Sequence, residues 1–152
     1  MQYGTPIYGV FLMPALREMY WGDQSGAFCN DDVLRLRPTP RFDDPLTFIA
    51  VPSNVHLEYE IDFARIRSFG STAAHLIYVA RGAAIGALLR RVKLWDVAGV
   101  LPILNHAGIE LRYLSGARFD SRDLLNGESA REPLVAAHQD RIERVQDSIR
   151  LK

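Results

Sequence analysis

The sequence has one cysteine, no excess of charge of either sign and no long apolar run. The single thiol, Cys29, excludes an internal disulfide framework and a zinc site built from several cysteines, and it fits a reducing compartment. The 18 basic and 18 acidic residues give a formal net charge of zero. Because nucleic acids and anionic membranes both attract a basic excess, this balance argues against either as the main partner.

Targeting and membrane-spanning segments are not evident in the sequence either. The apolar stretch from Ile7 to Met13 is too short to cross a bilayer, and the residues before it carry no basic side chain. We therefore expect a cytoplasmic protein that does not enter a membrane. The 152 residues, of which 48% are hydrophobic and 24% charged, predict one ordinary globular domain with at most a short appendage.

Residues 1–38 predict a three-strand antiparallel meander, set apart from the rest by a proline-rich boundary. The expected strands cover residues 7–13, 18–21 and 33–37, with turn-forming residues between them. The first strand is apolar on both faces, so it needs cover on both sides. Exposed apolar strand faces favour pairing, and we expect a homo-oligomer formed through the strand from Ile7 to Met13.

Residues 39–152 predict an α/β domain, because strands and helices alternate along it. We expect a mixed, largely parallel sheet flanked by helices. The expected strands are residues 46–51, 64–69, 84–89, 109–114 and 134–137, and the expected helices are residues 71–81, 97–107 and 139–151, with a short helix within 54–61 and a loop over 115–131. The expected core contains Phe48, Ile49, Val51, Ile77, Val79, Ile103 and Leu104.

One candidate binding segment lies where an expected strand meets an expected helix, at Gly70, Ser71 and Thr72. The free backbone N–H groups of a helix start can bind an anion or sugar hydroxyls. The alternative is ordinary helix capping by Ser71 or Thr72, which on this stretch alone is the favoured interpretation.

A second candidate is Asp96, which stands directly before an expected helix and beside Trp95. Its carboxylate can cap that helix, or it can turn an oxygen toward a hard cation. Magnesium takes about six oxygen ligands in near-octahedral geometry, so one aspartate cannot hold it. The four histidines show no metal-ligand spacing, Ser71 is not in a Gly-x-Ser-x-Gly turn, and no complete set of catalytic residues is evident.

Taken together, these segments resemble the inositol monophosphatase family of magnesium-dependent phosphatases. The resemblance rests on four motifs in family order: Gly26-Ala27-Phe28-Cys29-Asn30; Gly70-Ser71-Thr72-Ala73, followed by Val79-Ala80-Arg81-Gly82; Trp95-Asp96-Val97-Ala98-Gly99, followed by Asn105-His106-Ala107-Gly108; and Glu132-Pro133-Leu134 leading into the last helix. Each motif alone is modest, whereas four in the right order are specific. The resemblance covers residues 4–152.

The resemblance implies hydrolysis of inositol or related phosphate monoesters with Mg²⁺ as cofactor. It assigns Asp96 to a metal and Gly70, Ser71 and Thr72 to the substrate, with Trp95 as a structural residue beside the site. Independently of the resemblance, we expect Trp95 to pack beside the strand that holds Leu88.

The sequence also departs from the family pattern at functional positions. The family's Asp-Pro-x-Asp-Gly-Thr motif, its principal metal cage, does not occur in this sequence. Leu89 and Ile85 stand where acidic residues are expected, and His106 stands in place of a glutamate. Pro102 lies inside the signature helix, which it should bend because it removes a backbone donor.

Three hypotheses follow. The first is a family member that lacks the N-terminal metal-binding half and is inactive as an isolated chain, because most of the metal cage is absent. The second is the C-terminal portion of an active phosphatase, completed by another chain or by upstream sequence. The third is a dimerising interaction module that uses the first strand.

Overall fold

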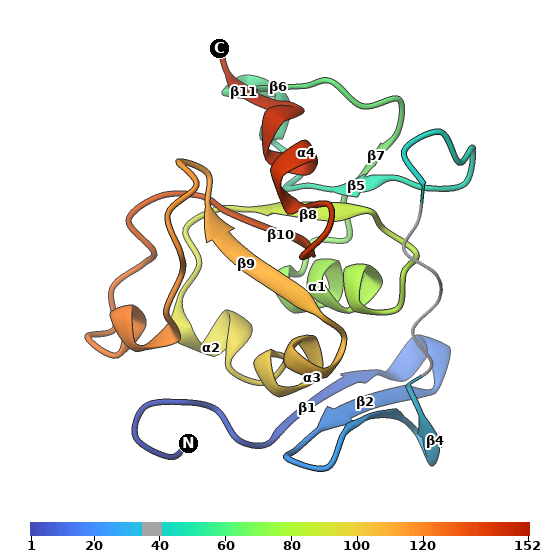
Figure 1. Cartoon of the computed structure of the whole chain (residues 1–152), viewed down its shortest axis with the longest axis vertical. Coiled ribbons are helices and arrows are strands. Elements are labelled where there is room, and N and C mark those ends of the chain that lie inside the picture. Colours follow the sequence, from blue (N-terminus) through green and yellow to red (C-terminus); the bar gives the residue numbers. More distant parts are fainter. Residues whose placement is uncertain (35–40) are drawn as a thin grey trace.

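A computed structural model describes residues 1–34 and 41–152. The N-terminal part of the chain forms a four-stranded antiparallel sheet (Figure 1). The strands follow one another in the order β1-β2-β3-β4. Their bounds are β1 Gly9–Met13, β2 Glu18–Gly22, β3 Ala27–Cys29 and β4 Asp32–Val33, with a 3-10 turn, η1 Pro14–Leu16, where Pro14 ends β1. The predicted antiparallel meander is confirmed, with one more strand than expected.

The inner face of this sheet lies directly against the helices. Gly9 pairs with Gly22 across β1 and β2, and neither position has room for a side chain. A Cβ on Gly9 would lie 2.2 Å from the carbonyl oxygen of Gly99, and one on Gly22 would lie 2.9 Å from the backbone nitrogen of Ile103. This close approach is possible only for glycine, and it fixes the sheet against the start of α3 (Leu101–His106).

The second part is a five-stranded mixed sheet in the order β7-β5-β8-β10-β9. The strands are β5 Ile49–Ala50, β7 Ile66–Arg67, β8 Gly86–Leu89, β9 Ile109–Tyr113 and β10 Leu134–His138. The predicted mixed sheet is confirmed. Its β7-β5 and β5-β8 pairings are parallel, whereas β8-β10 and β10-β9 are antiparallel, so parallel pairing is less dominant than expected.

Helices cover both faces of the five-stranded sheet (Figure 1). On one face α1 (Thr72–Ala80), α2 (Leu94–Val97) and α3 lie between the two sheets. On the other face lie α4 (Ile142–Asp147) and a two-stranded antiparallel sheet of β6 (Tyr59–Ile61) and β11 (Ile149–Leu151). Two 3-10 helices, η2 Val55–Leu57 and η3 Ser121–Leu124, complete the described elements.

Each face of the five-stranded sheet has its own hydrophobic core. The core that the sheet shares with α1 to α3 contains five of the predicted core residues: Phe48, Ile77, Val79, Ile103 and Leu104. Ile49 and Val51 belong to the core on the α4 side. All seven predicted core residues are buried.

A polar contact ties the first sheet to the end of α1. The Tyr20 hydroxyl donates to Glu18 Oε2 at 2.8 Å, and Arg81 Nη1 donates to the Tyr20 hydroxyl at 3.1 Å. Arg81 also forms an ion pair of 3.2 Å with Glu18. Burial, together with the hydrogen bond to Glu18, raises the pKa of Tyr20, so its hydroxyl remains a donor.

Two helix predictions were wrong in extent. The helix expected over residues 97–107 is interrupted, and Pro102 occupies the first turn of α3, where its missing N–H would be unpaired anyway. Pro102 therefore starts a helix instead of bending one. The C-terminal helix ends at Asp147, and Ile149 lies in β11, where edge pairing with β6 replaces the helical pattern.

Other predictions for residues 1–38 are corrected or lie outside the described residues. The strand expected over residues 33–37 overlaps β4 at Val33, where β4 ends. Residues 35–37 of that strand lie outside the described residues, and so does the expected boundary after residue 38. Within this chain the first strand is covered on one face: Phe11 packs on the core, whereas Leu12 is 56% exposed.

Candidate functional site

A cavity of about 330 Å³ opens where three parallel strands end. Its walls are residues 52–54 after β5, Ser68 and Gly70 after β7, and residues 88–91 at the end of β8. The first turn of α1 and Glu58 complete the lining. The carboxyl edge of parallel strands is where open α/β sheets bind ligands, and the volume suits a small molecule.

The structure brings the three predicted substrate residues, Gly70, Ser71 and Thr72, together in this lining. Gly70 has a φ of +70°, the left-handed conformation that turns the chain from β7 into α1. Ser71 Oγ accepts the Ala74 N–H at 3.2 Å, so the capping interpretation of this segment is confirmed. Capping does not use all the donors, because the backbone N–H groups of Thr72 and Ala73 have no acceptor among the described residues.

The sequence showed no metal-ligand spacing among the histidines and gave His75 no role in the site. His75 is buried in α1 and lines the cavity. Its Nε2 accepts the Phe69 N–H at 3.1 Å, and burial lowers the pKa of its imidazole. The neutral ring therefore holds the end of β7 against the helix, one residue before Gly70. Its position on the buried face of α1, four residues after the N-cap Ser71, was the available signal.

The remaining charged groups of the cavity are Glu58, Arg90 and Arg91. Arg90 forms an ion pair with Glu58, in which Nη2 donates to both carboxylate oxygens, and its guanidinium lies over the Tyr59 ring at 5.7 Å. Arg91 is exposed, has a φ of +50° and forms no ion pair with the part of the chain that the structure describes. The cavity therefore has one paired cation and one unpaired cation.

Asp96 is not among the residues that line this cavity, as far as the described residues show. It lies in the first turn of α2, where Oδ2 accepts the Lys93 N–H at 2.8 Å. Asp96 therefore caps a helix, as predicted, but it does so from inside the first turn of α2 and not from the position before a helix over residues 97–107. The expected packing of Trp95 against the strand of Leu88 was wrong, because Trp95 is 67% exposed and its ring instead contacts Lys93 Nζ, 4.9 Å from the ring centroid.

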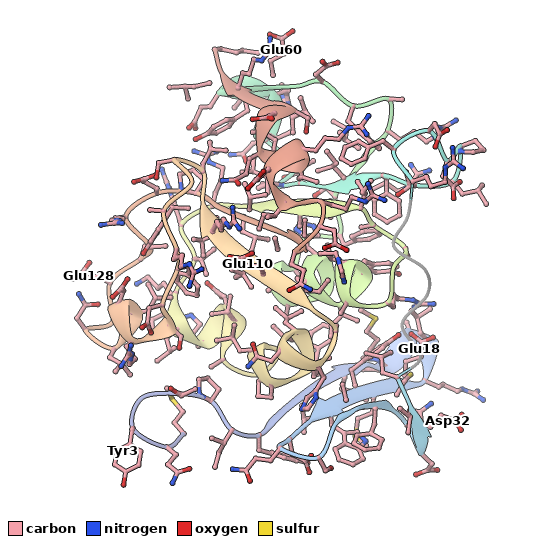
Figure 2. All side chains as sticks on the ribbon, in the orientation of Figure 1. Tyr3, Glu18, Asp32, Glu60, Glu110 and Glu128 are labelled. Carbon is pink, nitrogen blue, oxygen red and sulfur yellow. The ribbon has the colours of Figure 1, made fainter. Side chains whose placement is uncertain are left out.

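Carboxylates are dispersed in this structure. Glu60, Glu128 and Asp32 lie at separate parts of the outline in Figure 2, and Glu18 lies on the same side as Asp32, beside the first sheet. Nowhere in residues 1–34 and 41–152 do three histidine, cysteine or acidic side chains gather in a group able to hold a metal ion. Because Asp96 already uses one oxygen in helix capping, the donors described here do not by themselves fit a magnesium ion.

No helix in the described part of the chain is long and apolar enough to span a membrane.

Comparison with known proteins gives consistent matches. The profile of the inositol monophosphatase family matches residues 1–150. A histidinol-phosphatase of Chlorobaculum parvum is 29% identical over 83% of this chain and 56% of its own length. An inositol-1-monophosphatase of Mesorhizobium japonicum is also 29% identical, over 69% of this chain and 44% of its own length.

Solved structures show the same fold. A dual-specificity inositol monophosphatase/NADP phosphatase bound with D-inositol-1-phosphate superposes with a TM-score of 0.76 at 18% identity, covering 95% of this chain and 54% of that one. An inositol monophosphatase/NADP phosphatase complexed with Mg²⁺ and phosphate gives 0.77 at 19% identity, covering 95% and 54%. The chain thus spans about half the length of its relatives. From the profile match over nearly every residue, this chain belongs to the inositol monophosphatase family.

Proposed function

We propose that this chain binds the phosphate ester of inositol or a related sugar in the cavity at the end of β5, β7 and β8. The unused N–H groups of Thr72 and Ala73 at the start of α1 carry this proposal, because they suit an anionic phosphate oxygen. Gly70 and Ser71 shape the turn that presents these donors, and His75 holds that turn in place. The single cysteine and the sugar-phosphate ligand support a cytoplasmic location.

We propose further that the 152-residue chain does not hydrolyse the ester alone. Hydrolysis in this family depends on several metal-bound oxygens, and Asp96 is the one acidic residue of the sequence that matches a metal position. Its carboxylate is engaged at the start of α2, and the described residues bring no second and third ligand beside it. Binding without turnover is the expected behaviour.

The test is phosphate release from inositol 1-phosphate by the purified 152-residue chain, with and without Mg²⁺. We expect no release above the buffer, together with measurable binding of the ester by calorimetry. Asp96→Asn should leave that binding unchanged, whereas Gly70→Val should abolish it, because a β-branched residue is strained at a φ of +70°. Magnesium-dependent release that Asp96→Asn abolishes would overturn the inactive assignment.

A second candidate function is the C-terminal part of an active phosphatase. The coverage of the relatives favours it: the chain matches 56% of the Chlorobaculum parvum histidinol-phosphatase, so a further polypeptide could complete the site. Here Asp96 would contribute one ligand among others supplied from outside this chain.

Co-expression with the unmatched portion of that relative tests this candidate. We expect a stable complex whose phosphate release requires Asp96 if the site is completed between chains. Failure of the two polypeptides to associate, or release that survives Asp96→Asn, would contradict the second candidate and leave the binding function standing.

We also propose self-association through the outer face of the first sheet. The register aligns Val10, Trp21, Phe28 and Val33 in one row across all four strands, and this row contains no charged side chain. A two-fold axis would bury the same row from each copy, which is how isologous dimers form. In sedimentation, Leu12→Glu on this face should shift the protein to monomer, whereas Leu57→Glu on η2 should not. A wild-type protein that is monomeric at high concentration would contradict this proposal.

A further inference from the structure

A second cavity, of about 280 Å³, lies beside the start of α4, on the face of the five-stranded sheet opposite to α1. Its lining consists of three arginines, one phenylalanine and one aspartate: Arg41, Phe42, Asp43, Arg141 and Arg144. None of these residues lines the cavity at the ends of β5, β7 and β8. The lining of the second cavity therefore has more cations than carboxylates, and its formal charge is positive.

The aspartate of this lining neutralises one of the arginines. Arg41 Nε donates to Asp43 Oδ1 at 2.9 Å, and Arg41 Nη2 donates to Asp43 Oδ2 at 2.7 Å, which is the bidentate geometry of a matched pair. The hydrogen bond from Arg41 holds the pKa of Asp43 below its usual value, so this carboxylate is ionised at neutral pH. The positive charges of Arg141 and Arg144 are left over.

Arg141 and Arg144 form no ion pair within the described part of the chain. The acidic residues beside them in the sequence contact other groups. Glu143 lies 3.7 Å from an arginine of β9, and Asp140 lies 3.4 Å from a histidine of β10. The excess positive charge of the cavity is therefore not offset by the carboxylates next to it along the chain.

The surroundings of the two guanidinium groups provide few acceptors. Arg144 Cζ lies 3.9 Å from the centroid of the Phe42 ring, and a ring face attracts a cation but offers no oxygen to its N–H groups. Arg141 Nε is buried and has no hydrogen-bond partner among the described residues. Because arginine keeps its proton, a partly buried guanidinium is unfavourable until an anion compensates its charge.

We infer that Arg141 and Arg144 form a binding site for a single phosphate group, separate from the candidate site. Guanidinium groups match the geometry of phosphate oxygens, which accept several N–H bonds at once. The small volume of the cavity suits one such group. Inorganic phosphate and the phosphate of a nucleoside monophosphate share this chemistry, so the experiment compares the two.

The test is a titration of the isotope-labelled 152-residue chain with potassium phosphate, followed by NMR of the backbone amides. Amide shifts at residues 141–144 report the second cavity, whereas those at Thr72 and Ala73 report the candidate site. We expect saturable shifts at residues 141–144 that potassium chloride of the same ionic strength does not produce. A parallel titration with adenosine 5′-monophosphate identifies the source: tighter binding of the nucleotide indicates a phosphate monoester, and equal binding indicates inorganic phosphate.

Arginine variants show which groups bind the phosphate. Arg141→Gln and Arg144→Gln should each weaken the affinity at residues 141–144 by about fivefold or more, because a charge-assisted hydrogen bond is lost. Arg144→Lys should retain more of the affinity than Arg144→Gln. Arg131→Gln is the matched control, since Arg131 also lies over an aromatic ring, 4.4 Å from the centroid of Tyr113, but does not line the cavity. It should leave the affinity unchanged.

Three results would overturn the inference: shifts at residues 141–144 that do not saturate, shifts that potassium chloride reproduces, or an unchanged affinity in both glutamine variants. Thermal unfolding checks that each variant is folded, and Arg141→Gln still decides the matter if the loss of the Phe42 contact unfolds Arg144→Gln. The signals of Thr72 and Ala73 bear on the proposed function alone. Their failure to shift with inositol 1-phosphate would contradict that function and leave the second site standing.

Discussion

The two main sheets of this molecule differ in how much of their surface is covered. The five-stranded sheet has helices on both faces, and every residue of β8 is buried. The four-stranded sheet is covered on its inner face alone, and Val10, Leu12 and Val33 are exposed on the outer one. Both sheets are built from apolar strands, so apolar sequence alone does not tell which faces are covered.

The difference has a functional consequence. The candidate site lies at the carboxyl edge of the fully covered sheet, where α1 begins. The half-covered sheet offers an apolar surface, which is the property of an interface. The two proposals, ligand binding and self-association, thus concern separate parts of one small chain.

The largest expected effect is the loss of stability when a residue of the core between the two sheets is truncated. Ile77→Ala in α1 should lower the free energy of unfolding by about 2–5 kcal/mol, because Ile77 is fully buried in the core between the two sheets. Leu12→Ala on the outer face of the first sheet should change it by less than about 0.5 kcal/mol in the monomer. Denaturant unfolding monitored by circular dichroism measures both. Equal costs would mean that the outer face is covered in solution.

A smaller loss of stability is expected when a serine that accepts or donates a hydrogen bond in a turn of either region is replaced by alanine. Ser71→Ala should cost about 1 kcal/mol, since Ser71 Oγ accepts the Ala74 N–H at the start of α1. Ser25→Ala, in the exposed turn between β2 and β3, loses a hydrogen bond to Asp23 that competes with water, so its cost should be within about 0.5 kcal/mol. Thermal unfolding compares the two. A cost near zero for Ser71→Ala would show that the cap contributes nothing to the helix.

Glycine at the two left-handed arginines should stabilise both regions. Arg91→Gly beside the cavity and Arg17→Gly in the first sheet each relieve a strained backbone, at φ values of +50° and +54°. We expect a gain of about 0.5–1 kcal/mol for each, after the added entropy of glycine is subtracted. A loss of stability at Arg91 alone would show that its side chain contributes to packing as well as to the cavity.

The smallest expected effect is a change in stability at acid pH, and it comes from His75 in the candidate site. Burial lowers the pKa of His75 below its ordinary value of 6.5. Below pH 6.5 the unfolded chain takes up this proton more readily than the folded one, so the His75 contribution to stability is complete above that pH and declines as the pH falls toward the folded pKa. His75→Gln, whose amide oxygen can still accept the Phe69 N–H, should show less destabilisation between pH 6.5 and 5. Identical pH profiles of unfolding would contradict a buried neutral imidazole.

Much of the fold could be predicted because local patterns were strong. The apolar run of β5, the cap of α1 at Ser71 and the alternation in β9 each specify an element without help from distant residues. Element ends were less predictable. Ile149 continues a helical stripe in the sequence, but pairing with Ile61 on β6 places it in a strand.

In the candidate site too, some residues could be predicted from local sequence patterns and others depend on contacts between distant segments. Gly70, Ser71 and Thr72 could be predicted because a glycine and two hydroxyl residues at a strand–helix junction are a local signal. His75 and Arg91 could not, since their importance comes from the Phe69 N–H and from the cavity that three distant strands form. Asp96 could be assigned to helix capping locally, whereas its distance from the other carboxylates is a tertiary property.

The sequence by itself determined the order of elements, the balanced charge and the family, because these depend on residue types and their spacing along the chain. The tertiary structure decided which apolar face stays open, which cations share the cavity and how the acidic groups are dispersed. These properties depend on contacts between segments far apart in the chain, and neither composition nor periodicity specifies such contacts.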